Sequence, residues 1–214
     1  MNIYNVIILD ESGSMSSIYK ETLQGMNEVL GGIRKNQEEF PDQKHFVTIV
    51  TFEGCGMTGV KTRRDRVPIE NVQNFTEKDY RPGGCTPLYD AMGRTLNELE
   101  GLVNDDDRVF ATIITDGMEN SSEEYSGRIV KLMVERLRSK GWVFAYIGAN
   151  QDSVEVARDL DIANALNFDA CPTGVAKMSL SLRKAGRKMS KFFSTKTCNL
   201  EMIDSLFDEN EPPF

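Results

Sequence analysis

Three oxygen-bearing side chains follow a short apolar run near the start of the chain. The run covers residues 6–9, and Asp10, Ser12 and Ser14 come after it at alternate positions in a glycine-containing segment. A carboxylate and two hydroxyls are hard oxygen ligands, which suit Mg²⁺, Mn²⁺ or Ca²⁺ better than zinc or copper. Asp and Ser before a helix are also ordinary N-caps, so this spacing alone leaves both interpretations open.

A threonine and a second aspartate occupy comparable places later in the chain. Thr86 follows Gly83 and Gly84 and precedes Pro87, which can open a helix at its first position, so Thr86 is predicted to be the N-cap. Asp116 follows the apolar run 109–114, much as Asp10 follows the first run.

Two kinds of apolar segment alternate along the chain and must position these side chains. Short β-branched runs predict strands at 6–9, 45–52, 109–114, 142–147 and 165–168. Apolar residues at helical spacing predict helices at 15–35, from 87, from 121 or 122, from 152 or 153 to 160, and at 172–193. The double glycine at 31–32 should weaken the end of the first helix. This alternation predicts an α/β fold with parallel strands, whose carboxyl ends bring Asp10, Thr86 and Asp116 to one edge.

Residues 57–69 differ from the other apolar segments, because a charged cluster interrupts them. We interpret them as a short hairpin that turns at Arg63, Arg64 and Asp65. Its charges suit a solvated sheet edge that discourages pairing with other chains. A nucleic-acid role for this basic cluster is disfavoured in an acidic domain.

Composition limits the classes of function. The chain has 214 residues, a net charge of −8 and a pI of about 4.9, which argues against non-specific nucleic-acid binding. No apolar run is long enough to cross a bilayer, and residues 1–10 do not resemble a signal peptide. The four cysteines, Cys55, Cys85, Cys171 and Cys198, form no CxxC pair, and His45 is the single histidine. We therefore expect free thiols, no zinc site and a cytoplasmic location, with His45 at a strand edge rather than as a ligand.

The C-terminal part combines a basic helix with an acidic tail. The helix at 172–193 has an apolar stripe and an outer face of Lys and Arg, and acidic residues follow it. We predict a domain at 1–197 and an acidic tail at 198–214. Opposite charges favour the tail folding back on the helix, with a disordered chain end as the alternative.

Taken together, the segments DESGS, GGCTPLYDA and TDG resemble the three metal-site loops of the von Willebrand factor A-domain family, in the expected order. This family is the metal-binding module shared with integrin inserted domains, and the resemblance covers residues 3–193. It implies a doubly wound, mostly parallel, Rossmann-like sheet with one short antiparallel edge strand, a place that the segment at 57–69 would take. Helices would cover both faces.

The resemblance also implies a metal-ion-dependent adhesion site. Ser12, Ser14 and Thr86 would bind Mg²⁺ or Mn²⁺, with Ca²⁺ less favoured, and Asp10 and Asp116 would bind directly or through water. The open coordination position would accept an Asp or Glu of a partner protein. Glu11 and Glu119 add negative charge near this site, and Glu119 is expected to be solvated.

The leading interpretation is therefore a metal-dependent protein-binding module that is not an enzyme, with its oligomeric state open. One alternative is a Mg²⁺-dependent phosphohydrolase or phosphotransferase with Asp10 as the nucleophile. That chemistry needs a second carboxylate two residues on and a nearby lysine, but Ser12 occupies the position and no lysine closely follows Asp116. Another alternative is an accessory subunit of an ATPase assembly, which is compatible with the leading interpretation.

Overall fold

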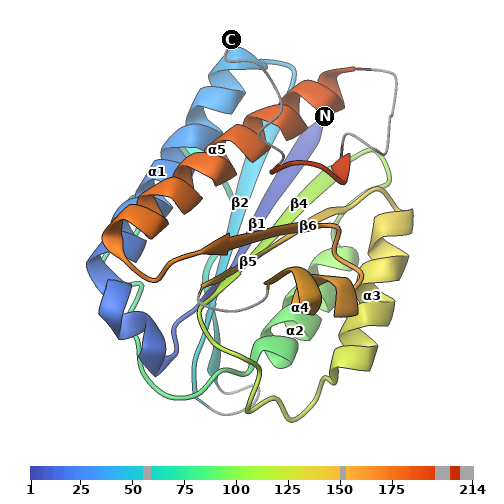
Figure 1. The fold of residues 1–214 in the computed structure, drawn as a ribbon. Helices are drawn as coiled ribbons and strands as arrows, with labels where there is room; N and C mark the ends of the chain where they lie inside the picture. Colours follow the sequence, from blue (N-terminus) through green and yellow to red (C-terminus); the bar gives the residue numbers. More distant parts are fainter. Residues whose placement is uncertain (55–58, 150–152, 196–202, 208–214) are drawn as a thin grey trace.

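A single six-stranded sheet organises the protein (Figure 1). The computed structural model describes residues 1–54, 59–149, 153–195 and 203–207. The strands are β1 (Asn2–Asp10), β2 (Lys44–Phe52), β3 (Val60–Pro68), β4 (Arg108–Thr115), β5 (Val143–Ala149) and β6 (Asn164–Phe168). Their order is β3-β2-β1-β4-β5-β6, and every neighbouring pair is parallel except β2 and β3. The predicted α/β fold, with a mostly parallel sheet and one antiparallel edge strand, is confirmed.

Helices cover both faces of the sheet. They are η1 (Gly13–Ile18), α1 (Tyr19–Glu39), η3 (Ile69–Asn71), α2 (Leu88–Glu100), α3 (Gly127–Ser139), α4 (Ser153–Asp159) and α5 (Pro172–Ser194). Helices α1 and α5 pack on one face, and α2, α3 and α4 lie on the other (Figure 1). Each face has its own apolar core, so β1 is buried on both sides, as its continuous apolar run predicts.

The double glycine in α1 does not end that helix, which continues to Glu39. A Cβ at Gly32 would lie 2.7 Å from Cγ of Arg183 in α5. The missing side chain lets α1 and α5 approach closely, so tertiary packing supports the helix through the double glycine despite its low helix propensity.

The predicted hairpin at 57–69 is also wrong. Residues 55–58 lie outside the described part, and Val60–Pro68 is one continuous strand that pairs antiparallel with β2. Arg63, Arg64 and Asp65 lie within this strand and not in a turn. Long charged side chains suit an exposed edge strand as well as a turn, and the sequence pattern does not separate the two.

Two helix starts differ from the prediction. Pro87 occupies the N-cap position of α2, one residue later than expected. Helix α3 is capped by Ser126, whose hydroxyl accepts a hydrogen bond from Ile129 N, and not by Ser121 or Ser122. The three residues predicted as caps, Thr86, Ser121 and Ser122, lie in or beside the site described below.

The chain end packs on the domain where it is described. Leu206 is buried with residues of β4, β5 and α5, and its amide donates to Oδ1 of Asn164 at 3.0 Å. Asp204 pairs with Arg138 of α3 at 3.3 Å. The segment 203–207 is therefore ordered against the domain, while the division at residue 197 stays a prediction.

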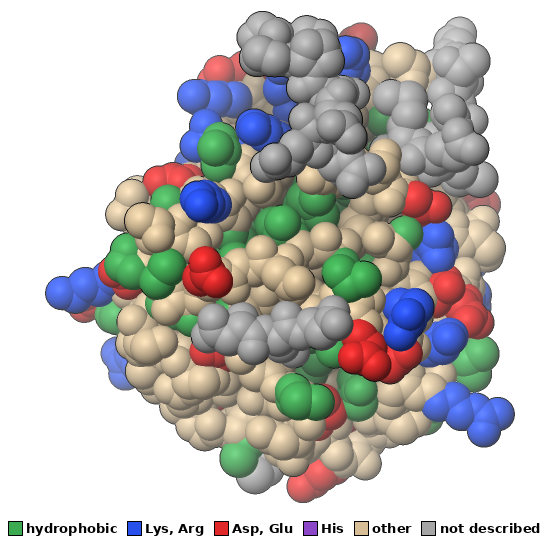
Figure 2. All heavy atoms as spheres, viewed as in Figure 1, with side chains coloured by type: hydrophobic (Ala, Val, Ile, Leu, Met, Phe, Trp, Pro, Cys, Tyr) green, Lys and Arg blue, Asp and Glu red, His purple; other side chains and the backbone are tan. Residues whose placement is uncertain are grey.

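The outer face of α5 is basic, as its sequence predicts. Its exposed or partly exposed cations are Lys177, Arg183, Lys184, Arg187, Lys188 and Lys191. Figure 2 shows Lys and Arg side chains gathered in the upper left of the view, where α5 crosses α1. Across the described residues, none of the helices is both apolar enough and long enough to cross a bilayer.

Candidate metal site at the carboxyl edge of the sheet

The strand order changes its direction of winding between β1 and β4. The chain passes from β1 to β2 on one side, and from β4 to β5 on the other. Ligands of open α/β sheets bind where the direction of winding reverses in this way. Leu9 lies opposite Ile114 in the β1–β4 register, so Asp10 and Asp116 follow at the same edge of the sheet.

Asp10 is fully buried, and both of its carboxylate oxygens accept hydrogen bonds. The amide of Ser12 donates to Oδ1 at 2.7 Å, and the hydroxyl of Thr115 donates to Oδ2 at 2.6 Å. Burial raises the pKa of Asp10 to about 6, although these hydrogen bonds act in the opposite direction, and the charge of Asp116 adds to the rise. A buried carboxylate with only neutral donors favours the approach of a cation.

The two serines connect Asp10 to Asp116. The hydroxyls of Ser12 and Ser14 lie 3.2 Å apart, and Ser14 Oγ donates to Oδ1 of Asp116 at 2.6 Å. Partial burial raises the pKa of Asp116 above its usual range. The alternating spacing at 10, 12 and 14 therefore places all three side chains at one site.

Thr86 completes the group from the start of α2. A Cβ built on Gly117 would lie 3.2 Å from Thr86 Oγ1 and 3.8 Å from both Asp10 Oδ2 and Ser14 Oγ. Three predicted ligand oxygens thus lie close together beside Gly117, where no side chain separates them. Carboxylate and hydroxyl oxygens gathered in this way fit a hard divalent cation. The structure brings together all five residues that the sequence singled out.

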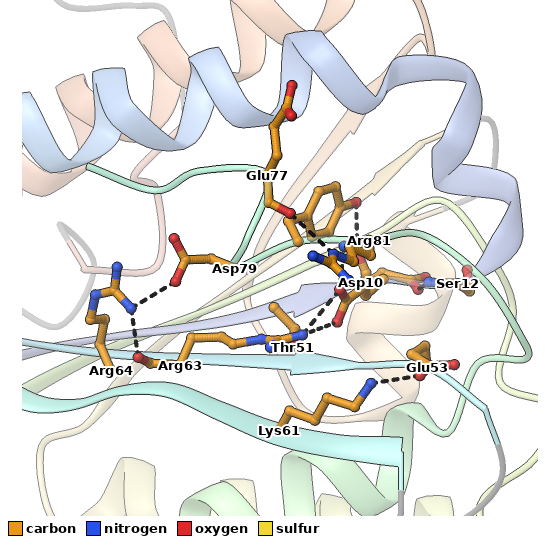
Figure 3. A network of polar contacts seen from close by, with 12 residues as sticks. Asp10, Ser12, Thr51, Glu53, Lys61, Arg63, Arg64, Glu77, Asp79 and Arg81 are labelled. Atoms are coloured by element: carbon orange, nitrogen blue, oxygen red, sulfur yellow. Dashed lines mark hydrogen bonds and ion pairs between the residues drawn. The ribbon is translucent and has the colours of Figure 1, made fainter. Parts of the chain in front are cut away.

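Glu11 does not contribute a free charge to the site, contrary to expectation. Its side chain is 1% exposed, and Arg63 Nη2 lies 2.8 Å from Oε2. Arg63 Nε also donates to Thr51 Oγ1 at 2.8 Å, and the amide of Arg81 donates to Glu11. Figure 3 shows Arg63 extending from β3 toward the end of β1 that carries Asp10. Arg63 therefore neutralises Glu11 and fastens the edge strand to the first loop.

Glu119 is also not a solvated charge. Its carboxylate accepts hydrogen bonds from the amides of Tyr89, Ser121 and Ser122 at 2.7–2.8 Å, and from the Ser122 hydroxyl at 2.6 Å. The expectation was wrong because these partners come from a loop and a helix start, whose proximity depends on tertiary structure.

Several supporting residues were missed from the sequence. Thr115 holds Asp10 and also accepts a hydrogen bond from Gly117 N at 3.1 Å. The buried Tyr80 donates its hydroxyl to the carbonyl of Asp10 at 2.8 Å. Thr115 could have been found, because it directly precedes Asp116. Nothing in the sequence pattern connects Tyr80 or Arg63 to this site.

Cysteine and histidine are the remaining residue types that could bind a metal. Cys85 and Cys171 are free thiols, while Cys55 and Cys198 lie outside the described residues. His45 is 1% exposed, and burial lowers its pKa to about 4. In the described part of the chain, His, Cys, Asp and Glu form no group of three or more that could hold a metal. The candidate site therefore depends on hydroxyl oxygens together with its two aspartates.

Comparisons with solved structures show the same fold. Proximal thread matrix protein 1 from the mussel byssus matches with a TM-score of 0.58 at 16% identity, over 87% of this chain and 46% of its own. A von Willebrand factor type A structure from Catenulispora acidiphila gives a TM-score of 0.58 at 12% identity, over 87% of this chain and 42% of its own. The SpRpn10 VWA domain gives 0.58 at 12% identity, over 83% of this chain and 93% of its own.

At these identities the likeness establishes the fold alone. The chain spans less than half the length of the mussel and Catenulispora chains. No protein-family model matches the sequence, and no curated protein matches it. The chain has a von Willebrand factor A-like fold.

Proposed function

We propose that this protein is a divalent-metal-dependent binding module that recognises an acidic residue of a partner protein. The observation that carries the proposal is the proximity of the Thr86, Asp10 and Ser14 oxygens to one another beside Gly117. Ser12, Ser14 and Thr86 would hold Mg²⁺ or Mn²⁺ through their hydroxyls, and Asp10 and Asp116 would bind directly or through water. A bound cation supplies an electrophilic position that a partner carboxylate can complete.

The residues around Asp10 favour binding over phosphoryl transfer. Phosphoryl transfer would need a second carboxylate two residues on, but Ser12 occupies that position, and its hydroxyl lies 3.2 Å from that of Ser14. The balance of charge also favours an acidic partner, because Glu11 is paired with Arg63 and does not face the site as a free anion. We place the protein in the cytoplasm on the basis of its sequence.

Calorimetric titration with Mg²⁺ tests the metal site. We expect wild type to bind Mg²⁺ and the Ser14→Ala and Asp10→Ala variants to lose at least about tenfold in affinity, because each removes an oxygen of the site. Ser16→Ala is the matched control, since Ser16 is exposed in the same short helix and belongs to no part of the site. Equal affinity of Ser14→Ala and wild type would contradict the assignment.

Partner capture tests the second half of the proposal. Immobilised wild type and Ser16→Ala should retain the same proteins from a lysate in Mg²⁺, and both should release them in EDTA. Ser14→Ala should retain none of these proteins. Retention that is indifferent to EDTA would exclude a metal-bridged partner.

A further inference from the structure

We propose that Glu119 and Asp90 are positioning residues of the candidate metal site, because they fasten the segment after Asp116 to the start of α2. This inference rests on the proposed function, since it concerns how the ligands of that site are held. Thr86 precedes α2 and Asp116 follows β4, so the two ligands lie in different loops. Their relative position depends on the contacts that join those loops.

Glu119 reaches from the Asp116 loop to the helix. Its Oε2 accepts the Tyr89 amide at 2.8 Å and the Ser122 hydroxyl at 2.6 Å. Its Oε1 accepts the amides of Ser121 and Ser122 at 2.8 and 2.7 Å. The Tyr89 amide lies in the first turn of α2 and has no partner within the helix, and a carboxylate is stabilising at that end. Glu119 therefore satisfies the helix and its own loop together.

Asp90 reaches in the opposite direction, from the helix to the loop. Its fully buried carboxylate accepts three successive amides, those of Glu123, Glu124 and Tyr125, at 2.8, 3.0 and 2.8 Å. Its own amide donates to the Ser122 hydroxyl at 3.0 Å. Glu119 thus accepts a hydrogen bond from the start of α2, and Asp90 of α2 accepts hydrogen bonds from the segment 119–125.

Asn120 extends the same connection to a predicted ligand. Its side-chain Oδ1 accepts a hydrogen bond from the backbone amide of Thr86 at 2.9 Å, and its backbone amide donates to the carbonyl of Thr86 at 3.2 Å. The backbone of Thr86 is therefore bound on both sides to a residue that follows Asp116 closely. The segment 119–125 therefore holds the backbone of Thr86 close to the loop that carries Asp116.

The test compares Glu119→Ala, Glu119→Gln and Asp90→Asn with wild type. Each variant is measured by Mg²⁺ titration, and its metal-free form by amide hydrogen exchange. We expect Glu119→Ala to lose about 10–100-fold in Mg²⁺ affinity and to exchange faster at Tyr89 and Thr86. Glu119→Gln, which keeps an acceptor oxygen, should recover part of the affinity. Glu124→Ala, an exposed change in the same segment, should match wild type in both measurements.

Each outcome decides the proposal. If Glu119→Ala binds Mg²⁺ as wild type does while its amides exchange faster, the residue is only structural and the inference is wrong. If Glu119→Ala does not fold, Glu119→Gln and Asp90→Asn carry the test, with an expected loss of at least about threefold. Absence of Mg²⁺ binding by wild type would instead overturn the proposed function, and this inference with it.

Discussion

Asp10 and Glu11 are neighbours in the sequence and are both buried, but the protein holds their charges differently. Glu11 has a cation at 2.8 Å, from Arg63. Asp10 accepts hydrogen bonds from the neutral groups of Ser12 and Thr115, and among the described residues it forms no ion pair. The Glu11 charge is therefore compensated within the protein, whereas the charge of Asp10 would be compensated by the proposed cation.

Replacing Arg63 should show how much its ion pair with the buried Glu11 contributes to stability. We expect Arg63→Met to lower the free energy of unfolding by about 3 kcal/mol, because it leaves the Glu11 carboxylate buried without a cation. Arg187→Met is the control, since the pair of Arg187 with Glu39 is exposed and should contribute about 0–1 kcal/mol. Urea unfolding measures both changes. Similar values for the two variants would show that Glu11 does not need its partner.

His45 should make stability depend on pH. Asn5 Nδ2 lies 3.2 Å from His45 Nδ1, and burial lowers the His45 pKa from 6.5 to about 4. Between these values the unfolded chain binds a proton that the folded protein does not. The contribution of about 3 kcal/mol is therefore complete above pH 6.5 and is lost as the pH falls toward 4.

The measurement compares the urea unfolding of wild type and His45→Gln at several pH values. The difference between them isolates the histidine, because the raised pKa of Asp10 acts in the opposite direction in both proteins. As His45 is the single histidine, its ring proton resonance reports the same equilibrium directly. A folded-state titration midpoint above pH 6 would contradict the prediction.

At the scale of elements, the sequence predicted which strands carry the residues of the site, but it did not predict the contacts that hold the surrounding segments together. Buried strands such as β1 and β4 have continuous apolar runs, so their ends and the positions of Asp10 and Asp116 could be inferred. Strand β3 is half exposed and charged, so its pattern is compatible with a turn. The contacts of Arg63 and Glu119 join segments distant in the sequence, and no local pattern reports them.

Two helical glycines should respond oppositely to the same substitution. Gly31 in α1 has open space around it, so Gly31→Ala should stabilise the protein by about 0.5–1 kcal/mol through higher helix propensity. Gly93 in α2 packs against the ring of Tyr125, so a Cβ there would clash. We expect Gly93→Ala to destabilise by about 1–3 kcal/mol. Thermal unfolding distinguishes the signs, and stabilisation by both substitutions would show that the ring moves aside at little cost.

At the scale of the whole molecule, the tail residues 203–207 complete a small third core. Leu206 is 3% exposed against Phe110, Val143 and Met189, which belong to β4, β5 and α5. The described tail residues therefore contact α5, as one sequence-based expectation had it, but through apolar side chains, while Asp204 pairs with Arg138 of α3. Apolar residues within an acidic tail carry the contact, and the charge pattern gave no indication of them.

Leu206→Ala should therefore lower the free energy of unfolding by about 2–3 kcal/mol, since it opens a cavity in this third core. Truncation after Thr197 should lower it further. Leu180→Ala is the control, because that side chain is 45% exposed on α5 and its loss should cost less than about 0.5 kcal/mol. Denaturant unfolding that left the truncated protein unchanged would mean that the tail adds nothing to stability.

The direction of β1 determines which way the candidate site faces relative to the chain's first residue. At a rise of about 3.3 Å per residue, the strand carries the chain roughly 26 Å from Asn2 to Asp10, across the full height of the sheet. Leu206 binds Asn164 at the start of β6, so the tail segment lies at the same end as Asn2 (Figure 1). A tether attached at Met1 would thus leave the site pointing away from its anchor. The length of the tether would determine how far the site could extend from its anchor, and the orientation of the sheet would determine the direction in which the site faces.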